Sequence, residues 1–242
     1  MATTNKTIEV LPNKPALVER AKEIVLARLQ AAIEARDCFT IALAGGSTPK
    51  PLYEALSQED LPWSKIHFFW GDERYVPATD RDSNQLMTRQ ALLDKIDIPA
   101  ENIHAVNTMG GDPNLDAQKY EAELQQFFQT QPGFPTFDLI LLGMGDDGHT
   151  ASLFPHTEAL EVRDRLITVG NKDGQPRLTF TFPLINRARC VLFLVAGANK
   201  RLALDRVFAE QGDETEYPSR SIDPDGEVLW LLDEEAASEL DK

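Results

Sequence analysis

The sequence predicts an α/β fold: a single domain with a doubly wound, mostly parallel sheet and helices on both faces, as in Rossmann-like proteins. Two observations predict it. Short apolar runs typical of buried strands alternate with longer segments in which apolar residues recur every three or four positions. No internal repeat, low-complexity tract or linker-like segment interrupts this alternation, so we expect one domain spanning residues 1–242.

In the first half of the chain, helices are predicted from helical spacing and from the residues that begin them. Pro15 suits the first turn of one helix, Asp82 or Ser83 can cap a second, and Asn114 can cap a third. Strands are predicted from apolar runs such as CFTIAL. In chain order we expect a helix at 15–35, a strand at 38–43, a helix at 50–56, a strand at 66–70, a helix at 83–93, a short strand at 103–106 and a helix at 115–130.

The second half opens with the most informative stretch, FDLILLGMGDDGHTASLFP, in which a buried strand runs into a glycine-rich turn with two carboxylates and a histidine. Ligands of open α/β sheets bind at the carboxyl ends of the strands. Further strands are predicted from similar apolar runs. In chain order we expect strands at 137–142, 166–169, 178–182 and 191–196, a helix at 200–208, a strand at 228–232 and a helix at 233–240.

Composition narrows the class of protein. A formal net charge of −15 argues against nucleic acid and anionic membranes as partners, and it would repel a phosphate unless local cations and backbone amides overcame that field. Cys38 and Cys190 lie in apolar runs, which favours buried side chains over a disulfide or zinc site. Residues 1–14 lack the apolar stretch of a signal peptide, and no apolar run approaches about 20 residues, so we expect a cytoplasmic protein.

A glycine-rich turn follows the strand at 38–43. Gly45 and Gly46 let backbone amides approach an anion, and Ser47 and Thr48 add hydroxyl donors at a helix start. The alternative is a plain strand–turn–helix connection. The turn has neither the P-loop spacing nor a dinucleotide fingerprint, so it is interpreted as a phosphate-binding turn of another kind.

A charged cluster of Asp72, Glu73 and Arg74 follows the strand at 66–70. It can orient a sugar hydroxyl or a water molecule, or it can be a solvated loop with a weak ion pair. Two further cations, Arg177 and Lys200, lie beside strands and can hold a phosphate, although surface exposure is the ordinary fate of such side chains.

The turn after the strand at 137–142 carries Asp146, Asp147 and His149. Imidazole titrates near neutral pH, so His149 is a candidate general base, and Asp147 can orient its ring or the attacking water. The alternative is a histidine that caps the next helix, with the aspartates as turn formers. The remaining histidines show no ligand spacing, so no metal site is expected.

These motifs follow four separate strands, and parallel strands would bring all four to one crevice. Six segments of the chain also match the sequence motifs of a known family: LAGGSTPKPLYEAL, FFWGDERYVPATDRDSN, FDLILLGMGDDGHTASLFP, RLTFTFPLIN, GANKRLAL and YPSRSI. On these segments the chain resembles the glucosamine-6-phosphate isomerase/6-phosphogluconolactonase family. The related deaminases carry a glutamate five residues beyond the DGH histidine, where this chain has Phe154, and a phenylalanine cannot move protons.

The resemblance implies hydrolysis of 6-phosphoglucono-1,5-lactone to 6-phosphogluconate in the oxidative pentose phosphate route, without metal or organic cofactor. It implies His149, Asp147 and Asp72 as catalytic residues. The phosphosugar is expected to be the partner, with no nucleic acid or membrane, for a monomer or weak homodimer. The residues expected to bind the substrate and its phosphate are Gly45, Gly46, Ser47, Thr48, Arg74, Arg177 and Lys200.

Two alternatives stay open. The first is an amino-sugar deaminase or aldose–ketose isomerase on the same fold, which release of ammonia from glucosamine-6-phosphate would reveal. The second is a non-catalytic sugar-phosphate sensor, a class that usually carries an attached DNA-binding module. Only about a dozen polar residues precede the first helix, and the charge is strongly negative, which argues against the sensor.

Overall fold

A parallel sheet of six strands forms the centre of the molecule in this computed structural model, which describes residues 5–130 and 133–240. Every neighbouring pair of strands in it is parallel. The ends of the expected 1–242 domain lie outside the described residues. From one edge to the other the strands are β1 (Asn5–Leu11), β9 (Glu227–Asp233), β8 (Cys190–Val195), β5 (Leu139–Leu142), β2 (Phe39–Leu43) and β3 (Ile66–Trp70).

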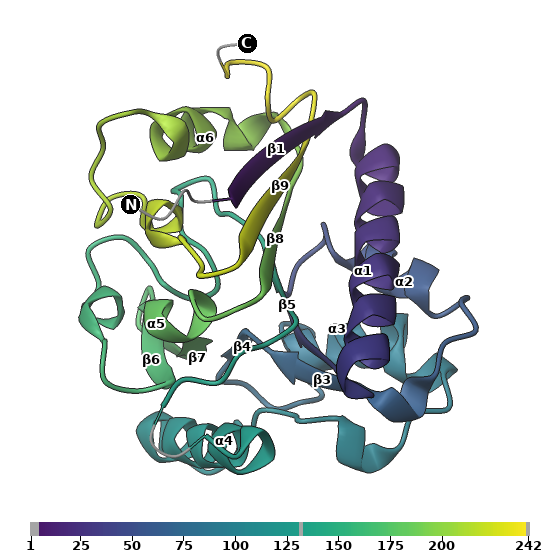
Figure 1. The fold of residues 1–242 in the computed structure, drawn as a ribbon. Coiled ribbons are helices and arrows are strands. Elements are labelled where there is room, and N and C mark those ends of the chain that lie inside the picture. The colour runs from purple at the N-terminus through teal and green to yellow at the C-terminus, as the bar shows by residue number, and fades with distance from the viewer. Residues whose placement is uncertain (1–4, 131–132, 241–242) are drawn as a thin grey trace.

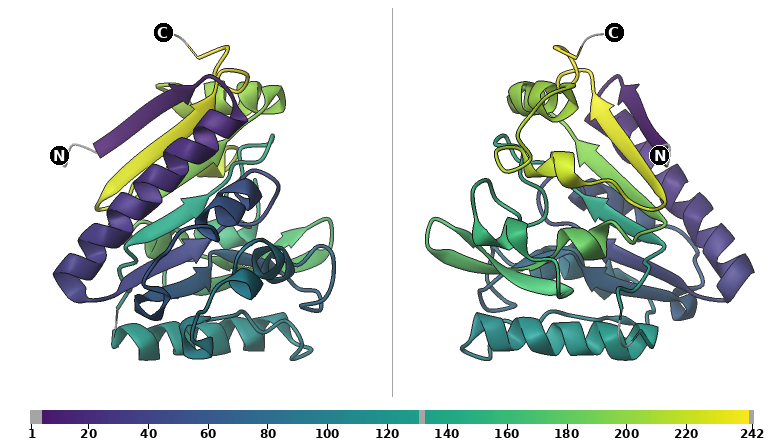
Figure 2. Two further views of the ribbon diagram at one scale, coloured as in Figure 1. Left: turned by 90° about the vertical axis from the view of Figure 1, so that its right-hand side faces the viewer. Right: turned by 60° about the vertical axis from the view of Figure 1, so that its left-hand side comes forward.

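Helices cover both faces of this sheet, which confirms the predicted fold class. Figures 1 and 2 show the longest helix, α1, along one face and α6 on the other. Helix α1 begins where predicted, because the Asn13 side chain accepts a hydrogen bond from the Ala16 amide and Pro15 occupies the first turn. The helices are α1 (Lys14–Arg36), α2 (Lys50–Leu56), α3 (Asn84–Ala91), α4 (Pro113–Phe128), α5 (Phe182–Ile185) and α6 (Arg201–Phe208).

A second, antiparallel sheet lies beside the first and was not predicted. Its strand order is β4 (Asp72–Arg74), β7 (Gln175–Phe180) and β6 (Ile167–Lys172). The two strands expected near here are a hairpin, because Asp173 and Gly174 both have positive φ, the geometry of a tight hairpin turn. The charged cluster, for which a solvated loop was one of two interpretations, forms strand β4, which pairs with this hairpin.

Two sequence predictions at the periphery are wrong. Residues 103–106 form no strand beyond one isolated bridge between Phe68 and Ile103. The expected helix at 233–240 is a series of turns, in which the Asp233 carboxylate accepts from the Gly197 and Ala236 amides.

Strand β1 was missed because only one of its edges is paired. Its polar residues alternate with Ile8 and Val10, which are exposed on the outermost strand of the sheet. An edge strand that is half exposed gives a much weaker apolar signal than a buried central strand.

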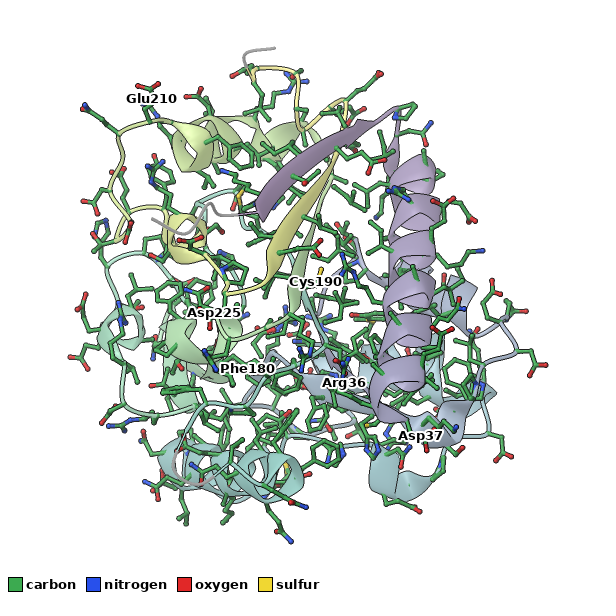
Figure 3. All side chains as sticks on the ribbon, viewed as in Figure 1. Arg36, Asp37, Phe180, Cys190, Glu210 and Asp225 are labelled. Carbon is green, nitrogen blue, oxygen red and sulfur yellow. The ribbon has the colours of Figure 1, made fainter. Side chains whose placement is uncertain are left out.

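The core fills the space between the sheet and its covering layers. Every residue of β2, β5 and β8 is buried, as the unbroken apolar runs predict. Cys190 is buried in β8 and Cys38 is partly buried, and both are free thiols. Figure 3 shows Cys190 inside the molecule and Asp37 at the surface beyond the end of α1. No helix within residues 5–130 and 133–240 is long and apolar enough to cross a membrane.

Candidate active site

A cavity of about 350 Å³ opens where β2, β3, β5 and β8 end. This size lies in the range of small-molecule sites. The strand ends meet here because the four strands are parallel neighbours in the sheet. Asp147 lies behind His149 and outside the lining. The predicted site residues that line the cavity are Gly45, Gly46, Ser47, Thr48, Asp72, Arg74, His149, Arg177 and Lys200.

The glycine-rich turn after β2 is built so that only glycine fits at its first position. A Cβ on Gly45 would lie 1.9 Å from Oδ1 of Asn84, and Gly46 has a φ of 97°. The hydroxyl of buried Tyr53 accepts from the Ala44 amide and donates to the Ala44 carbonyl, which fixes the base of the turn. The turn therefore presents its amides and hydroxyls to the cavity in one conformation.

Lys14 fixes the far side of the same turn. Its Nζ donates to the Ser47 carbonyl at 2.8 Å. This cation comes from the first turn of α1, in a different part of the chain from the glycine-rich turn. It adds positive charge beside Ser47 and Thr48, which favours an anion there.

The DGH turn after β5 holds the imidazole against a carboxylate. Oδ1 of Asp147 lies 2.5 Å from Nδ1 of His149 and also accepts from the His149 amide at 3.1 Å. A Cβ on Gly145 would lie 2.1 Å from that Nδ1, so the close packing requires glycine. Gly148 has a φ of 77°, which lets the chain turn sharply before the histidine.

The charge of Asp147 decides the tautomer of His149. Burial opposes ionisation of Asp147, but its hydrogen bonds to His149 outweigh that cost and lower the pKa of Asp147 to about 2. The ionised carboxylate can only accept, so Nδ1 of the imidazole carries the proton. Nε2 of neutral His149 then has a free lone pair on a side chain that lines the cavity. This is the arrangement of a general base.

Asp72 also lines the cavity and is fixed by several hydrogen bonds. Its Oδ2 accepts from the Ser152 hydroxyl at 2.6 Å, and its backbone carbonyl accepts from the Asn84 side chain at 3.0 Å. Ser152 is itself fixed because its amide donates to the Thr179 hydroxyl. The buried carboxylate is therefore aimed at the cavity by partners from three other segments.

Glu73 is a structural residue rather than a cavity residue. It is almost fully buried. Its carboxylate accepts hydrogen bonds from the Arg74 amide in β4 and from the Asn84 and Gln85 amides at the start of α3. Burial raises the pKa of the Glu73 carboxyl, and these amide donors oppose the rise. The contact joins β4 to α3 and fixes the backbone that carries Arg74.

Lys200 lies at the end of the loop after β8, just before α6. Gly197 has a φ of 99°, and its amide donates to both carboxylate oxygens of Asp233. The Lys200 amide donates back to the Gly197 carbonyl, closing a 3₁₀ turn. The position of Lys200 on the cavity wall thus depends on a carboxylate of β9.

The cavity is locally electropositive although the whole chain is acidic. Its lining contains the cations Arg74, Arg177 and Lys200 but a single carboxylate, that of Asp72. This local excess of positive charge opposes the repulsion that the chain's net charge of −15 would exert on a phosphate. Within the described ranges no three histidine, cysteine or acidic side chains cluster so as to hold a metal ion.

Several residues of this site were not singled out from the sequence. Asn84, which lines the cavity, and Ser152 and Lys14, which do not, all contact distant segments of the chain, so local pattern gave no signal for them. Asn199 also lines the cavity, next to the predicted Lys200. The one sequence signal for Asn84 is the glycine at position 45, whose missing side chain leaves room for it.

A glycine-rich turn, three cations and an imidazole oriented by a carboxylate, gathered at the carboxyl edge of a parallel sheet, are features of an α/β enzyme that acts on a small molecule. Residues 12–230 match the family described as glucosamine-6-phosphate isomerases/6-phosphogluconolactonase. The chain belongs to this family, and the resemblance stated from the sequence motifs is confirmed.

Relatives and solved structures agree with this assignment. The chain is 63% identical to a 6-phosphogluconolactonase of Nostoc sp. over 97% of this chain and 98% of that protein. A 6-phosphogluconolactonase structure from Trypanosoma cruzi superposes with a TM-score of 0.89 at 32% identity, covering 99% of this chain and 98% of the other. A monomeric glucosamine-6-phosphate deaminase shares the fold, with a TM-score of 0.80 at 21% identity over 96% and 99% of the two chains.

Proposed function

We propose that this chain hydrolyses 6-phosphoglucono-1,5-lactone to 6-phosphogluconate in the oxidative pentose phosphate pathway. The observation that carries the proposal is the His149–Asp147 pair, whose imidazole lines the same cavity as the anion-binding turn. The names of the relatives, which are 63% identical or less, support the same substrate. The acidic chain works as a cytoplasmic monomer or weak homodimer, without nucleic acid or membrane partners.

The phosphate is held at one end of the cavity by the turn from Gly45 to Thr48 and by Lys200. Amides and hydroxyls of the turn donate to the phosphate oxygens, while the lysine supplies a point charge. Arg177 and Arg74 add a second cationic wall. The lactone ring then extends toward His149, and Asp72 accepts a hydrogen bond from a sugar hydroxyl or from the attacking water.

Hydrolysis needs one water and no covalent enzyme intermediate, because a lactone is an activated ester. Nε2 of His149 takes a proton as the water oxygen bonds to the carbonyl carbon. The tetrahedral oxyanion collapses, the bond between that carbon and the ring oxygen breaks, and the imidazolium returns the proton to that oxygen. A general base accelerates such a reaction by roughly 10²–10⁴-fold. Hydrogen-bond donors directed at the oxyanion contribute a similar factor to the rate. Arg74 and the amides of residues 143–148 are the candidate donors.

No metal or organic cofactor takes part in this scheme. The ionised Asp147 stabilises the imidazolium that forms during attack, which is the role a buried carboxylate plays in other histidine-based hydrolytic sites. Deamination of an amino sugar is disfavoured because the position five residues beyond His149 is Phe154, whose ring packs on the imidazole. Ammonia release from glucosamine-6-phosphate measures that second activity directly.

The decisive experiment replaces His149 with asparagine and follows lactone hydrolysis above the spontaneous background. Turnover is expected to fall by about 10²–10⁴-fold while binding of 6-phosphogluconate stays close to that of wild type. His156→Asn is the matched control, since His156 lies outside the cavity lining and its positive φ suits asparagine. Near-normal turnover in the His149 variant would reject the mechanism, and absent turnover in wild type would reject the substrate.

A further inference from the structure

Phe154 occupies a buried position directly beneath the proposed catalytic histidine. The segment that follows His149 makes a tight turn, in which Thr150 and Leu153 form an antiparallel bridge. The Phe154 carbonyl accepts from the Thr157 hydroxyl at 2.8 Å, which fixes the backbone on the other side. Only 5% of Phe154 is exposed, so its ring has one well-defined place.

The ring contacts the imidazole and two cations. Its centroid lies 4.5 Å from that of His149, with the two planes tilted by 45°. Cζ of Arg177 lies 5.3 Å from the ring centroid, and Nζ of Lys172 lies 5.5 Å from it. Both separations fall within the range of a cation–π contact. One aromatic side chain thus joins the base to the cationic wall of the cavity.

Arg177 depends on this contact. Within the described part of the chain its guanidinium makes no ion pair and no hydrogen bond, and its buried Nε has no partner. Burial and the nearby charge of Arg74 lower the pKa of Arg177, and the carboxylates of Asp72, Asp82 and Glu73, none of which forms an ion pair with it, offset this only in part. The aromatic face attracts a cation without cancelling its charge, whereas a carboxylate in the same place would neutralise it.

We propose that Phe154 is a positioning residue that holds Arg177 beside the cavity, without an ion-pair partner, for the anionic part of the substrate. The same ring packs on His149 but offers it no hydrogen-bond acceptor, so among the described residues Asp147 is the acceptor that holds Nδ1. The inference rests on the proposed function, because it assigns this cation to the phosphosugar.

The test compares the binding of 6-phosphogluconate and of inorganic phosphate by calorimetry in wild type and Phe154→Leu. Leucine keeps apolar volume but has no π face, so Arg177 loses its anchor. We expect the Kd for 6-phosphogluconate and the KM for the lactone to rise roughly three- to tenfold. The fall in kcat should be smaller, because Asp147 still orients His149. Phe154→Tyr keeps an aromatic face and should retain most of the affinity.

Phe182→Leu is the matched control. Its ring is also buried beneath an arginine, since Cζ of Arg163 lies 5.6 Å from its centroid, but Arg163, unlike Arg177, lies outside the cavity lining. The same substitution there should leave Kd and KM within about twofold of wild type, while thermal unfolding reports any general loss of packing. An equal rise in Kd in this control would overturn the assignment.

A double-mutant cycle separates positioning from simple packing. If Phe154 acts through Arg177, Phe154→Leu should add little to the Kd of the Arg177→Met variant, because the cation it holds is already gone. Full additivity of the two substitutions, or an unchanged Kd in Phe154→Leu alone, rejects the inference. These binding measurements need no turnover, so they decide the point even if wild type hydrolyses no lactone and the proposed function fails.

Discussion

Arg74 of β4 and Arg177 of β7 lie directly opposite each other in an antiparallel strand pair, and each has a buried Nε without a partner. Directly opposed side chains lie on the same face of a sheet, where like charges destabilise the pair. Neither guanidinium has a carboxylate partner among the described residues. The fold therefore keeps two cations side by side at the cavity wall, where an anionic ligand would relieve their repulsion.

Arg177→Met should raise stability while weakening binding. Removing one of the opposed charges is expected to increase the free energy of unfolding by roughly 0.5 kcal/mol, after allowance for solvent screening. Affinity for 6-phosphogluconate should fall by about tenfold or more. Denaturant unfolding and calorimetry measure the two effects. Arg165→Met, at an exposed pair with Asp164, is the control and should change neither. A clear loss of stability in Arg177→Met would contradict the repulsion.

Asp147→Asn should reduce kcat strongly because it removes the acceptor that sets the tautomer of His149. An amide can donate to Nδ1, which moves the ring proton to Nε2 and blocks the base. We expect kcat to fall by about 10²–10⁴-fold with a much smaller change in KM. Steady-state kinetics measures this split. Asp146→Asn is the neighbouring control, and an equal loss of kcat there would show that the turn rather than the tautomer was disturbed.

The same Asp147 carboxyl makes stability depend on pH in the acid range. Its pKa of about 2 lies below the ordinary value of 3.8, so the ionised form favours the folded state. The contribution is present above about pH 4 and is lost as pH falls toward 2. After discounting for its partial exposure, the loss is about 1 kcal/mol. Urea unfolding of Asp147→Asn should show a shallower decline over this interval than wild type.

His67→Phe should flatten the pH dependence of stability between pH 6.5 and 4. Burial and the neighbouring His104 lower the pKa of His67 to about 4, so the folded state resists a proton that the unfolded state accepts. The contribution of neutral His67 to the free energy of unfolding is fully present above pH 6.5. It is lost as pH falls toward 4, by about 1 kcal/mol after allowance for exposure. Phenylalanine suits the site because Phe127 already packs on this ring, at 4.7 Å.

Unfolding in urea at a series of pH values measures this slope. His156→Asn, at an exposed turn, should keep the wild-type pH dependence. The same slope in His67→Phe as in wild type would show that another group carries the effect.

The sequence was most reliable where local pattern and tertiary environment agree. The buried strands β2, β5 and β8 were found because full burial on both faces demands an unbroken apolar run. It failed at β1 and β4, which are short or exposed strands whose pairing partners lie far away in the chain. It also predicted a last helix where the chain forms only turns.

The sequence itself therefore determined the order of the buried strands along the chain and the residues that follow them. It also determined that the four motifs meet in one crevice. Parallel strands in one sheet must bring their carboxyl ends together. Tertiary structure alone decided the electrostatic detail. The β6–β7 hairpin folds onto β4, so Arg177 faces Arg74, and Ser152 reaches Asp72. Such contacts depend on which surfaces pack together, and periodicity along the chain does not encode them.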